Sequence, residues 1–403
     1  MTWSSIFGTA SAERLRRLAQ DRSVTGAFFV FALTRLFVLA VFITAAAVTL
    51  DRTAPGFDPD DPHPTVRVQP AKIMSALTHT LSRGDTGWYQ SIAENGYDRV
   101  PFETRTQHNW AFFPLYPLLM RMAATWSGQY LLAGALLSNV LFFAALVLLH
   151  RMTTALGYES PTADRAIFYA AVFPVGYFFS LPLTEALFLC LVVASFLAAV
   201  RGHWWAAGLL GALASGTRLS GIFLLPALAL FYFQRTERPR WGREFFWLAL
   251  IPSGLLAFMF ILWQMTGNPL ACIDAVAAWE RKSGFILTTL FDYLRHPLQL
   301  AEAWNFRALN FAAAILALGV AFFWLRKRHW AFAAFTFLAI ALPLSSSTLQ
   351  SAARYVSVIF PVYMALAIVA RRAWVDQTIR FTFLVLFALM TLFYALRFSF
   401  AAA

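Results

Sequence analysis

Residues 24–50 read VTGAFFVFALTRLFVLAVFITAAAVTL, a long apolar run with a single charge at Arg35. An α-helix needs about 20 apolar residues to cross the ~30 Å hydrocarbon core of a bilayer. The run is too long for the apolar region of a cleaved signal peptide, so we expect a retained first membrane span. An arginine in mid-span costs about 2.5–3.5 kcal/mol. We therefore expect Arg35 to face the other helices in an ion pair.

Similar runs recur along the whole chain, which has 403 residues, of which 60% are hydrophobic and 13% charged. The runs are continuous, without the period-two alternation of membrane strands, and they predict an all-α polytopic membrane protein. The net charge of +12 does not indicate nucleic acid, because the basic residues gather in short loops. The apolar segments are 24–50, 112–126, 129–149, 164–181, 184–200, 204–217, 219–233, 245–266, 306–325, 330–345, 355–370 and 378–397.

The segment 112–126 decides the topology, because it is short and has two prolines in its first turns, where proline disrupts helical hydrogen bonds. If it is re-entrant, the N-terminal segment and five short loops, with 17 of the 32 Lys and Arg, fall on one side. The positive-inside rule then predicts about eleven spans, with the N-terminus inside and the C-terminus outside. We predict one membrane domain over 1–403, with external loops at 51–126 and 267–305.

The first external loop holds two predicted short helices. Apolar residues recur on one face from Ala71, and a second helix is expected from Thr86 to Asn95, ended by Gly96. Asp85 precedes this second helix. It is either an N-cap, a position that favours aspartate, or a general base held at the membrane surface.

The sequence of this loop resembles a known family. GDTGWYQSIAENGYD (84–98) followed by NWAFFPLYPLL (109–119) is similar to the signature of the PIG-V family, the mannosyltransferases that add the second mannose of GPI anchors, and of their bacterial relatives. One departure is Gly84, where the family has tryptophan. Further matches are SLPLTEALF (180–188), GALASGTRLSGIFLLP (211–226), GNPLACIDAVAAW (267–279) and SAARYVSVIFP (351–361).

The resemblance implies a GT-C fold and an inverting glycosyltransferase, with mannose as the expected sugar. The donor would be a polyprenyl-phosphate sugar, and the acceptor a hydroxyl of a glycan, glycolipid or protein. The reaction would take place on the external face of a bacterial plasma (inner) membrane. The essential acid of the family maps onto Asp85.

A lipid-phosphate leaving group also needs cations. We predict this role for Arg218 and Arg354, at the outer ends of spans, with snorkelling to the headgroups as the alternative. Glu185 is an acid expected within the depth of the membrane. Its predicted role is to bind a sugar hydroxyl, to assist Asp85 or to pair with an arginine. The remaining predicted substrate-binding residues are Trp88, Tyr89, Tyr355 and His108, the last with a solvated loop histidine as the alternative.

Metal and cofactor sites are not expected. The seven histidines lack a paired i, i+4 spacing, and Asp58-Pro59-Asp60 lies in a Pro-rich coil. The alternative function from another class is a transporter or flippase of a lipid-linked saccharide. A transporter would place charges at the midplane of broken helices, whereas this chain gathers polar and aromatic residues in two external loops. A protein or lipid A glycosyltransferase of the same architecture is a closer alternative.

Overall fold

The computed structural model of the protein describes residues 21–51, 70–234, 242–279, 281 and 284–402. These residues form α-helices and short 3₁₀-helices joined by loops, with one isolated bridge between Glu302 and Asn305. The prediction of an all-α membrane protein is confirmed.

Among the described residues, five helical segments are long and apolar enough to cross a membrane. They are α2 (Arg22–Asp51), α6 (Tyr130–Ala155), η4 with α11 (Arg243–Leu250 and Ser253–Thr266), α14 (Arg307–Arg326) and α18 (Ala373–Ala395). Shorter helices complete the bundle: α7 (Ser160–Ala171), α8 (Glu185–Val200), α9 (Trp204–Ser215), η3 with α10 (Leu219–Phe223 and Leu224–Gln234), α15 (Trp330–Leu344), α16 (Ala352–Ser357) and α17 (Phe360–Val369). The count of eleven spans stays a prediction.

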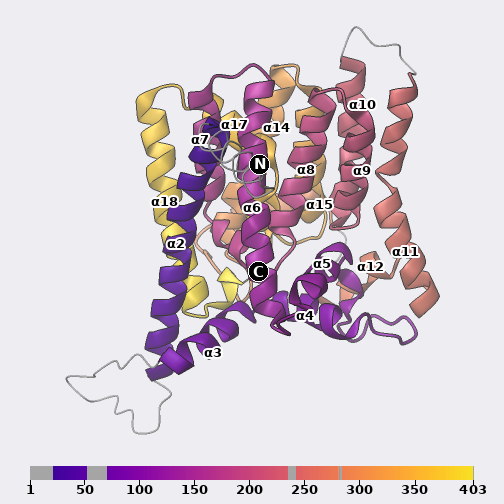
Figure 1. Cartoon of the computed structure of the whole chain (residues 1–403), viewed down its shortest axis with the longest axis vertical. Coiled ribbons are helices and arrows are strands. Elements are labelled where there is room, and N and C mark those ends of the chain that lie inside the picture. The colour runs from indigo at the N-terminus through magenta and orange to yellow at the C-terminus, as the bar shows by residue number, and fades with distance from the viewer. Residues whose placement is uncertain (1–20, 52–69, 235–241, 280, 282–283, 403) are drawn as a thin grey trace, which may run out of the picture.

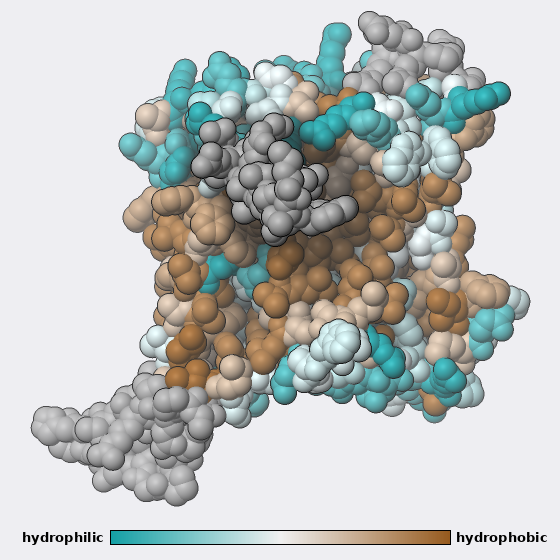
Figure 2. Space-filling view, in the orientation of Figure 1, coloured by the Kyte–Doolittle hydropathy of each residue, from teal (hydrophilic) through white to brown (hydrophobic). Residues whose placement is uncertain are grey.

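The outer surface of the bundle is apolar. Figure 2 shows a hydrophobic band across the middle of the molecule between two hydrophilic rims. Phe29 of α2, for example, leaves 79% of its surface exposed. Exposed apolar side chains on such a scale indicate contact with lipid. The protein is an integral, multi-pass membrane protein.

Helix α8 lies at the centre of the bundle, packed between α6 and α9 (Figure 1). It is apolar on every side, as a helix surrounded by protein should be, and nearly all of its side chains are buried. Its first residue is Glu185, so the fold carries a carboxylate into the interior at the positive end of the α8 dipole.

Short helices gather at one end of the bundle, the lower end in Figure 1: α3 (Pro70–Leu81), α4 (Thr86–Asn95), α5 (Leu115–Ala124) and α12 (Ala271–Asp274). Helix α4 has the predicted bounds, and Gly96 follows it at φ 84°. Helix α5 has ten residues, or about 15 Å, half of the hydrocarbon thickness. Other helices of the bundle, such as α17, are equally short, so the re-entrant placement of this segment stays a prediction.

Arg35 forms no ion pair with any other residue that the structure describes, so the prediction of one is wrong. The Arg35 guanidinium donates to the carbonyl oxygens of Gly176 (2.9 Å) and Ala171 (3.1 Å) and to the Ser180 hydroxyl (3.0 Å). It also lies 4.9 Å from the centroid of the Phe142 ring. The carbonyls are available because the chain leaves the α-helical conformation after α7, so they satisfy the arginine without a carboxylate.

Candidate functional site

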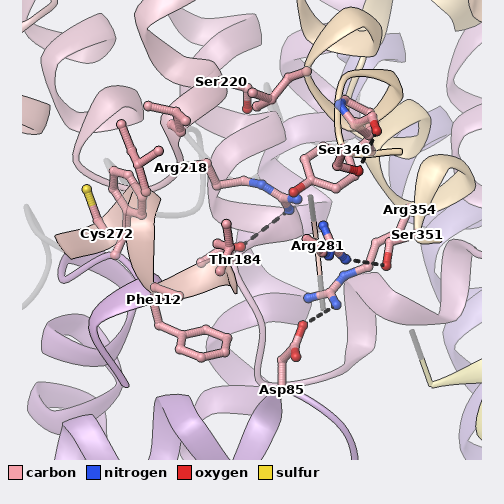
Figure 3. Close-up of a pocket in the computed structure, with 18 of the residues that line it drawn as sticks. Asp85, Phe112, Thr184, Arg218, Ser220, Cys272, Arg281, Ser346, Ser351 and Arg354 are labelled. Atoms are coloured by element: carbon pink, nitrogen blue, oxygen red, sulfur yellow. Dashed lines mark hydrogen bonds and ion pairs between the residues drawn. The ribbon is translucent and has the colours of Figure 1, made fainter. Parts of the chain in front are cut away.

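Asp85 stands at the N-cap position of α4, but its side chain makes no capping hydrogen bond. The backbone carbonyl of Asp85 accepts the N–H groups of Trp88 (3.1 Å) and Tyr89 (3.4 Å), which starts the helix. The carboxylate instead forms an ion pair with Arg354 through Oδ2 at 2.5 Å, and 36% of the side chain is exposed. The interpretation of Asp85 as a side-chain cap is therefore wrong. Its carboxylate is directed into the site shown in Figure 3.

The structure explains why glycine stands at position 84, where the family has tryptophan. Gly84 has φ +59°, and a Cβ atom there would lie 2.7 Å from the Ala402 carbonyl oxygen. A tryptophan would be strained in the left-handed backbone conformation, and its side chain would clash with Ala402. The glycine thus lets the C-terminal segment pack beside the residue that precedes α4.

Asp85 is the outer member of a chain of four charged side chains. Arg354 of α16 bridges Asp85 and Glu185, to which its Nε donates at 2.5 Å. Arg218, just before η3, donates to the same Glu185 oxygen at 2.7 Å. The Glu185 side chain is fully buried, and its second oxygen, Oε2, has no hydrogen-bond partner among the described residues.

Aromatic rings flank the two arginines of this network. The Arg354 guanidinium lies 4.9 Å from the centroid of the Phe178 ring, and the Arg218 guanidinium lies 4.9 Å from that of Tyr355. Such cation–π contacts favour a buried guanidinium, as do its ion pairs. The predicted alternative of snorkelling is wrong for both arginines, because both point inward and are paired with acids.

The network lines a cavity of about 620 Å³ at the α4 end of the bundle (Figure 3). Its wall comes from α4, the segment before α5, η3, α12, the end of α15 and α16. The polar and charged residues in this wall are Asp85, Tyr89, Thr104, Thr184, Thr217, Arg218, Ser220, Asp274, Arg281, Ser345, Ser346, Ser351, Arg354 and Tyr355. The predicted residues Asp85, Tyr89, Arg218, Arg354 and Tyr355 thus meet in one cavity, with Glu185 directly behind them.

Sequence reasoning missed Arg281 and Ser351 in this wall. The signal was present, because Arg281 follows GNPLACIDAVAAW by two positions and Ser351 opens SAARYVSVIFP. Both residues stand at or just beyond the end of a motif, and the sequence does not show that these two ends meet in one cavity.

Tyr89 lines the cavity with a buried ring. Burial, together with the nearby Glu185, raises the pKa of Tyr89 well above its ordinary value. Tyr89 therefore keeps its proton at neutral pH and is suited to donate a hydrogen bond rather than to act as a base. Trp88 is not part of the cavity wall. It stacks on Phe112, with 5.7 Å between the ring centroids, and meets the edge of Trp279.

The predicted substrate-binding role of His108 does not fit its position. His108 is outside the cavity wall, and both of its ring nitrogens are engaged, with Asp98 (3.0 Å) and Glu103 (3.1 Å). The His108 ring also stacks on the Trp110 ring, with 4.2 Å between the ring centroids. Burial by itself lowers the pKa of His108, but the hydrogen bonds to the two acids outweigh this effect and raise it. His108 braces the loop between α4 and α5.

The part of the chain that the structure describes contains no group of three His, Cys, Asp or Glu side chains placed to hold a metal ion. The Asp58-Pro59-Asp60 sequence lies outside the described residues.

Comparison with known proteins gives two kinds of similarity. The chain is 31% identical over 182 residues to the rat (Rattus norvegicus) GPI alpha-1,6-mannosyltransferase 2, and 29% identical over 202 residues to the human (Homo sapiens) protein. These matches cover 43% and 47% of this chain, but only 35% and 38% of the relatives. The chain thus matches a little over a third of the length of these relatives.

Two solved structures are similar at low sequence identity. ArnT from Cupriavidus metallidurans bound to undecaprenyl phosphate is 12% identical, with a TM-score of 0.44 over 91% of this chain and 76% of ArnT. AglB from Archaeoglobus fulgidus, in complex with an inhibitory peptide and a dolichol-phosphate, is 14% identical, with a TM-score of 0.42 over 91% of this chain and 55% of AglB. The family model described as mannosyltransferase (PIG-V) matches residues 24–236. More than half of the chain lies within this match, and the protein belongs to the mannosyltransferase (PIG-V) family.

Proposed function

We propose that this protein is a membrane mannosyltransferase that transfers a hexose, mannose, from a polyprenyl-phosphate sugar to an acceptor hydroxyl with inversion. The family membership supports the sugar and the class of reaction. The acceptor would be a hydroxyl of a glycan, glycolipid or protein. The site would face the outside of a bacterial plasma (inner) membrane.

The position of the Asp85 carboxylate is the single observation that carries the proposal. Its Oδ2 is held by Arg354, whereas its Oδ1 makes no hydrogen bond among the described residues and the side chain is partly exposed in the cavity. A general base needs one oxygen within hydrogen-bond reach of the substrate proton and a fixed position. The ion pair supplies the position, and the free oxygen supplies the proton acceptor.

The chemistry follows from this arrangement. The acceptor oxygen attacks the anomeric carbon on the face opposite the phosphate, and its proton passes to Asp85. The bond between the anomeric carbon and the phosphate oxygen breaks, and the phosphate leaves with the electron pair. The configuration at the anomeric carbon is inverted by this single displacement.

Glu185 supports the base through Arg354. The Arg354 guanidinium is shared between the carboxylates of Asp85 and Glu185. Because Glu185 contacts the same guanidinium at 2.5 Å, part of that positive charge is already neutralised. We propose that Glu185 and Arg218 position Arg354, rather than contact the sugar.

The external orientation rests on the distribution of charge. Helix α6 starts next to α5 and, with 26 residues, extends about 39 Å away from it. Its far end carries the basic residue Arg151, and the cavity lies at the near end with α4. Basic loops mark the cytoplasmic side. This supports a cavity that opens toward the external surface.

The test is transfer of radiolabelled mannose from polyprenyl-phosphate-mannose in proteoliposomes that contain the purified protein. Transfer to a glycan, glycolipid or peptide acceptor, lost in Asp85→Asn, would support the proposal. Movement of the lipid-linked sugar across the bilayer without transfer would instead support the transporter. Mass spectrometry of cell-envelope glycans with and without the protein would identify the acceptor.

A further inference from the structure

The wall of the cavity holds three arginines, and they are not equivalent. Arg354 contacts two carboxylates, and Arg218 contacts one. Arg281 lines the same cavity and forms no ion pair among the described residues. Among the described residues it contacts two hydroxyls, that of Ser351, to which its Nη2 donates at 3.5 Å, and that of Tyr355.

From this difference we infer that Arg281, with the hydroxyl of Ser351, forms the anion subsite that binds the phosphate group of the lipid-linked donor. The inference rests on the proposed function and deepens it. It transfers to Arg281 the role that the sequence assigned to Arg354 and Arg218.

The charges of the network already balance. Two carboxylates, Asp85 and Glu185, face two guanidiniums, Arg218 and Arg354, so the four charges cancel within the network. For a phosphate to bind Arg354 it would have to compete with two carboxylates, one of them fully buried. Separating a buried charge from its partner is strongly unfavourable. The network is therefore a poor site for a second anion.

Arg281 can bind an anion more readily than the arginines of the network. It is only partly buried, so an anion can approach it without displacing a carboxylate. Asp274, the remaining acid in the wall, accepts a hydrogen bond from Asn268 at 2.9 Å and forms no ion pair with Arg281. A guanidinium in this state can offer its parallel N–H groups to a phosphate.

Ser351 adds a hydrogen-bond donor beside it. The Ser351 side chain is buried, and its hydroxyl donates no hydrogen bond among the described residues. A buried hydroxyl without an acceptor is a donor in need of a partner. A phosphate oxygen between Arg281 and Ser351 would satisfy both groups.

The position of the subsite agrees with the reaction. In Figure 3, Arg281 and Ser351 lie together in the cavity on the far side of the Arg354 guanidinium from Asp85. A phosphate held there and a base at Asp85 would lie apart in the cavity, with the Arg354 guanidinium between them in this view. That separation is what an attack opposite the leaving phosphate requires.

The test compares the donor KM of Arg281→Ala and Arg281→Lys with that of the wild-type protein. Loss of a charge-assisted hydrogen bond should raise the donor KM about ten- to a hundredfold in Arg281→Ala. Arg281→Lys keeps the charge but loses the planar donor pair, so its KM should be intermediate. The matched control is Arg295→Ala, which removes the same charge from an exposed position on α13 (Ile286–Arg295) of the same loop. Its donor KM should not change.

A binding measurement separates the inference from the proposed function. Undecaprenyl phosphate in detergent is titrated into each variant, without any sugar transfer. Weaker binding in Arg281→Ala but not in Arg295→Ala supports the subsite, even if the wild-type protein were found to transfer no mannose. Equal binding and equal donor KM in Arg281→Ala and the wild-type protein would overturn it. If inorganic phosphate competes with the lipid only in proteins that keep Arg281, the subsite recognises the phosphate itself, which supports the same assignment.

Discussion

Replacing Asp85 with asparagine removes the proton acceptor while keeping the size of the side chain. A neutral amide cannot take the proton of the acceptor hydroxyl, and loss of a general base typically lowers the rate by about 10²–10⁴-fold. The fold should tolerate the change, because Arg354 keeps its contact with Glu185 at 2.5 Å. Since the Asp85 side chain is 36% exposed, the lost ion pair should lower the free energy of unfolding by no more than about 1 kcal/mol.

Asp85→Ala tests whether the Asp85 side chain caps α4. If the side chain capped α4, alanine would cost about 1 kcal/mol more than asparagine, which is itself a good cap. The Asp85 side chain makes no capping bond, so the alanine and asparagine variants should melt at nearly the same temperature.

The assay is turnover at saturating donor and acceptor, beside a thermal melt of each purified variant. Glu94→Gln is the matched control, because it neutralises an exposed acid on the same helix, whose carboxylate accepts a hydrogen bond from Gln90 and forms no ion pair among the described residues. It should turn over like the wild-type protein. Turnover of Asp85→Asn within a few-fold of wild type would refute the assignment of the base. An alanine variant that melts well below the asparagine variant would refute the conclusion that the Asp85 side chain does not cap α4.

Three other changes test the network, the loop and the topology. Glu185→Gln removes the buried acid shared by two arginines and should lower the free energy of unfolding by about 3–5 kcal/mol, measured by chemical denaturation; an unchanged stability would contradict the buried ion pairs. His108→Ala should lower the melting temperature more at pH 6 than at pH 9. Its acidic neighbours raise the pKa of His108, so stabilisation by the ionised ring is full below about 6.5 and is lost as the pH rises through the raised value. Equal losses at both pH values would contradict this. In a variant without the native cysteines, a cysteine at position 105 should react with an impermeant reagent from outside and one at 327 should not; the reverse would exclude the predicted orientation.

Local sequence signals predicted the elements that depend on local interactions. The bounds of α4 at Thr86 and Asn95 were predicted by its apolar face and by Gly96, and the structure has the same bounds. These signals act within a few residues, so they can be read without knowledge of the fold. The Arg35 prediction failed for the opposite reason, because its partners are carbonyls 136 and 141 positions along the chain.

The sequence by itself determined that the chain is a helical membrane protein, and it singled out Asp85, Glu185, Arg218 and Arg354 as residues of interest. Only the tertiary structure decided which of these charges form ion pairs with one another. Asp85 and Arg354 are 269 positions apart, and Glu185 and Arg354 are 169 apart. Electrostatic energy depends on the distance through space and on burial, not on separation along the chain. The sequence could therefore name Arg218 and Arg354 without showing that carboxylates neutralise both, and it did not single out Arg281, which forms no ion pair among the described residues.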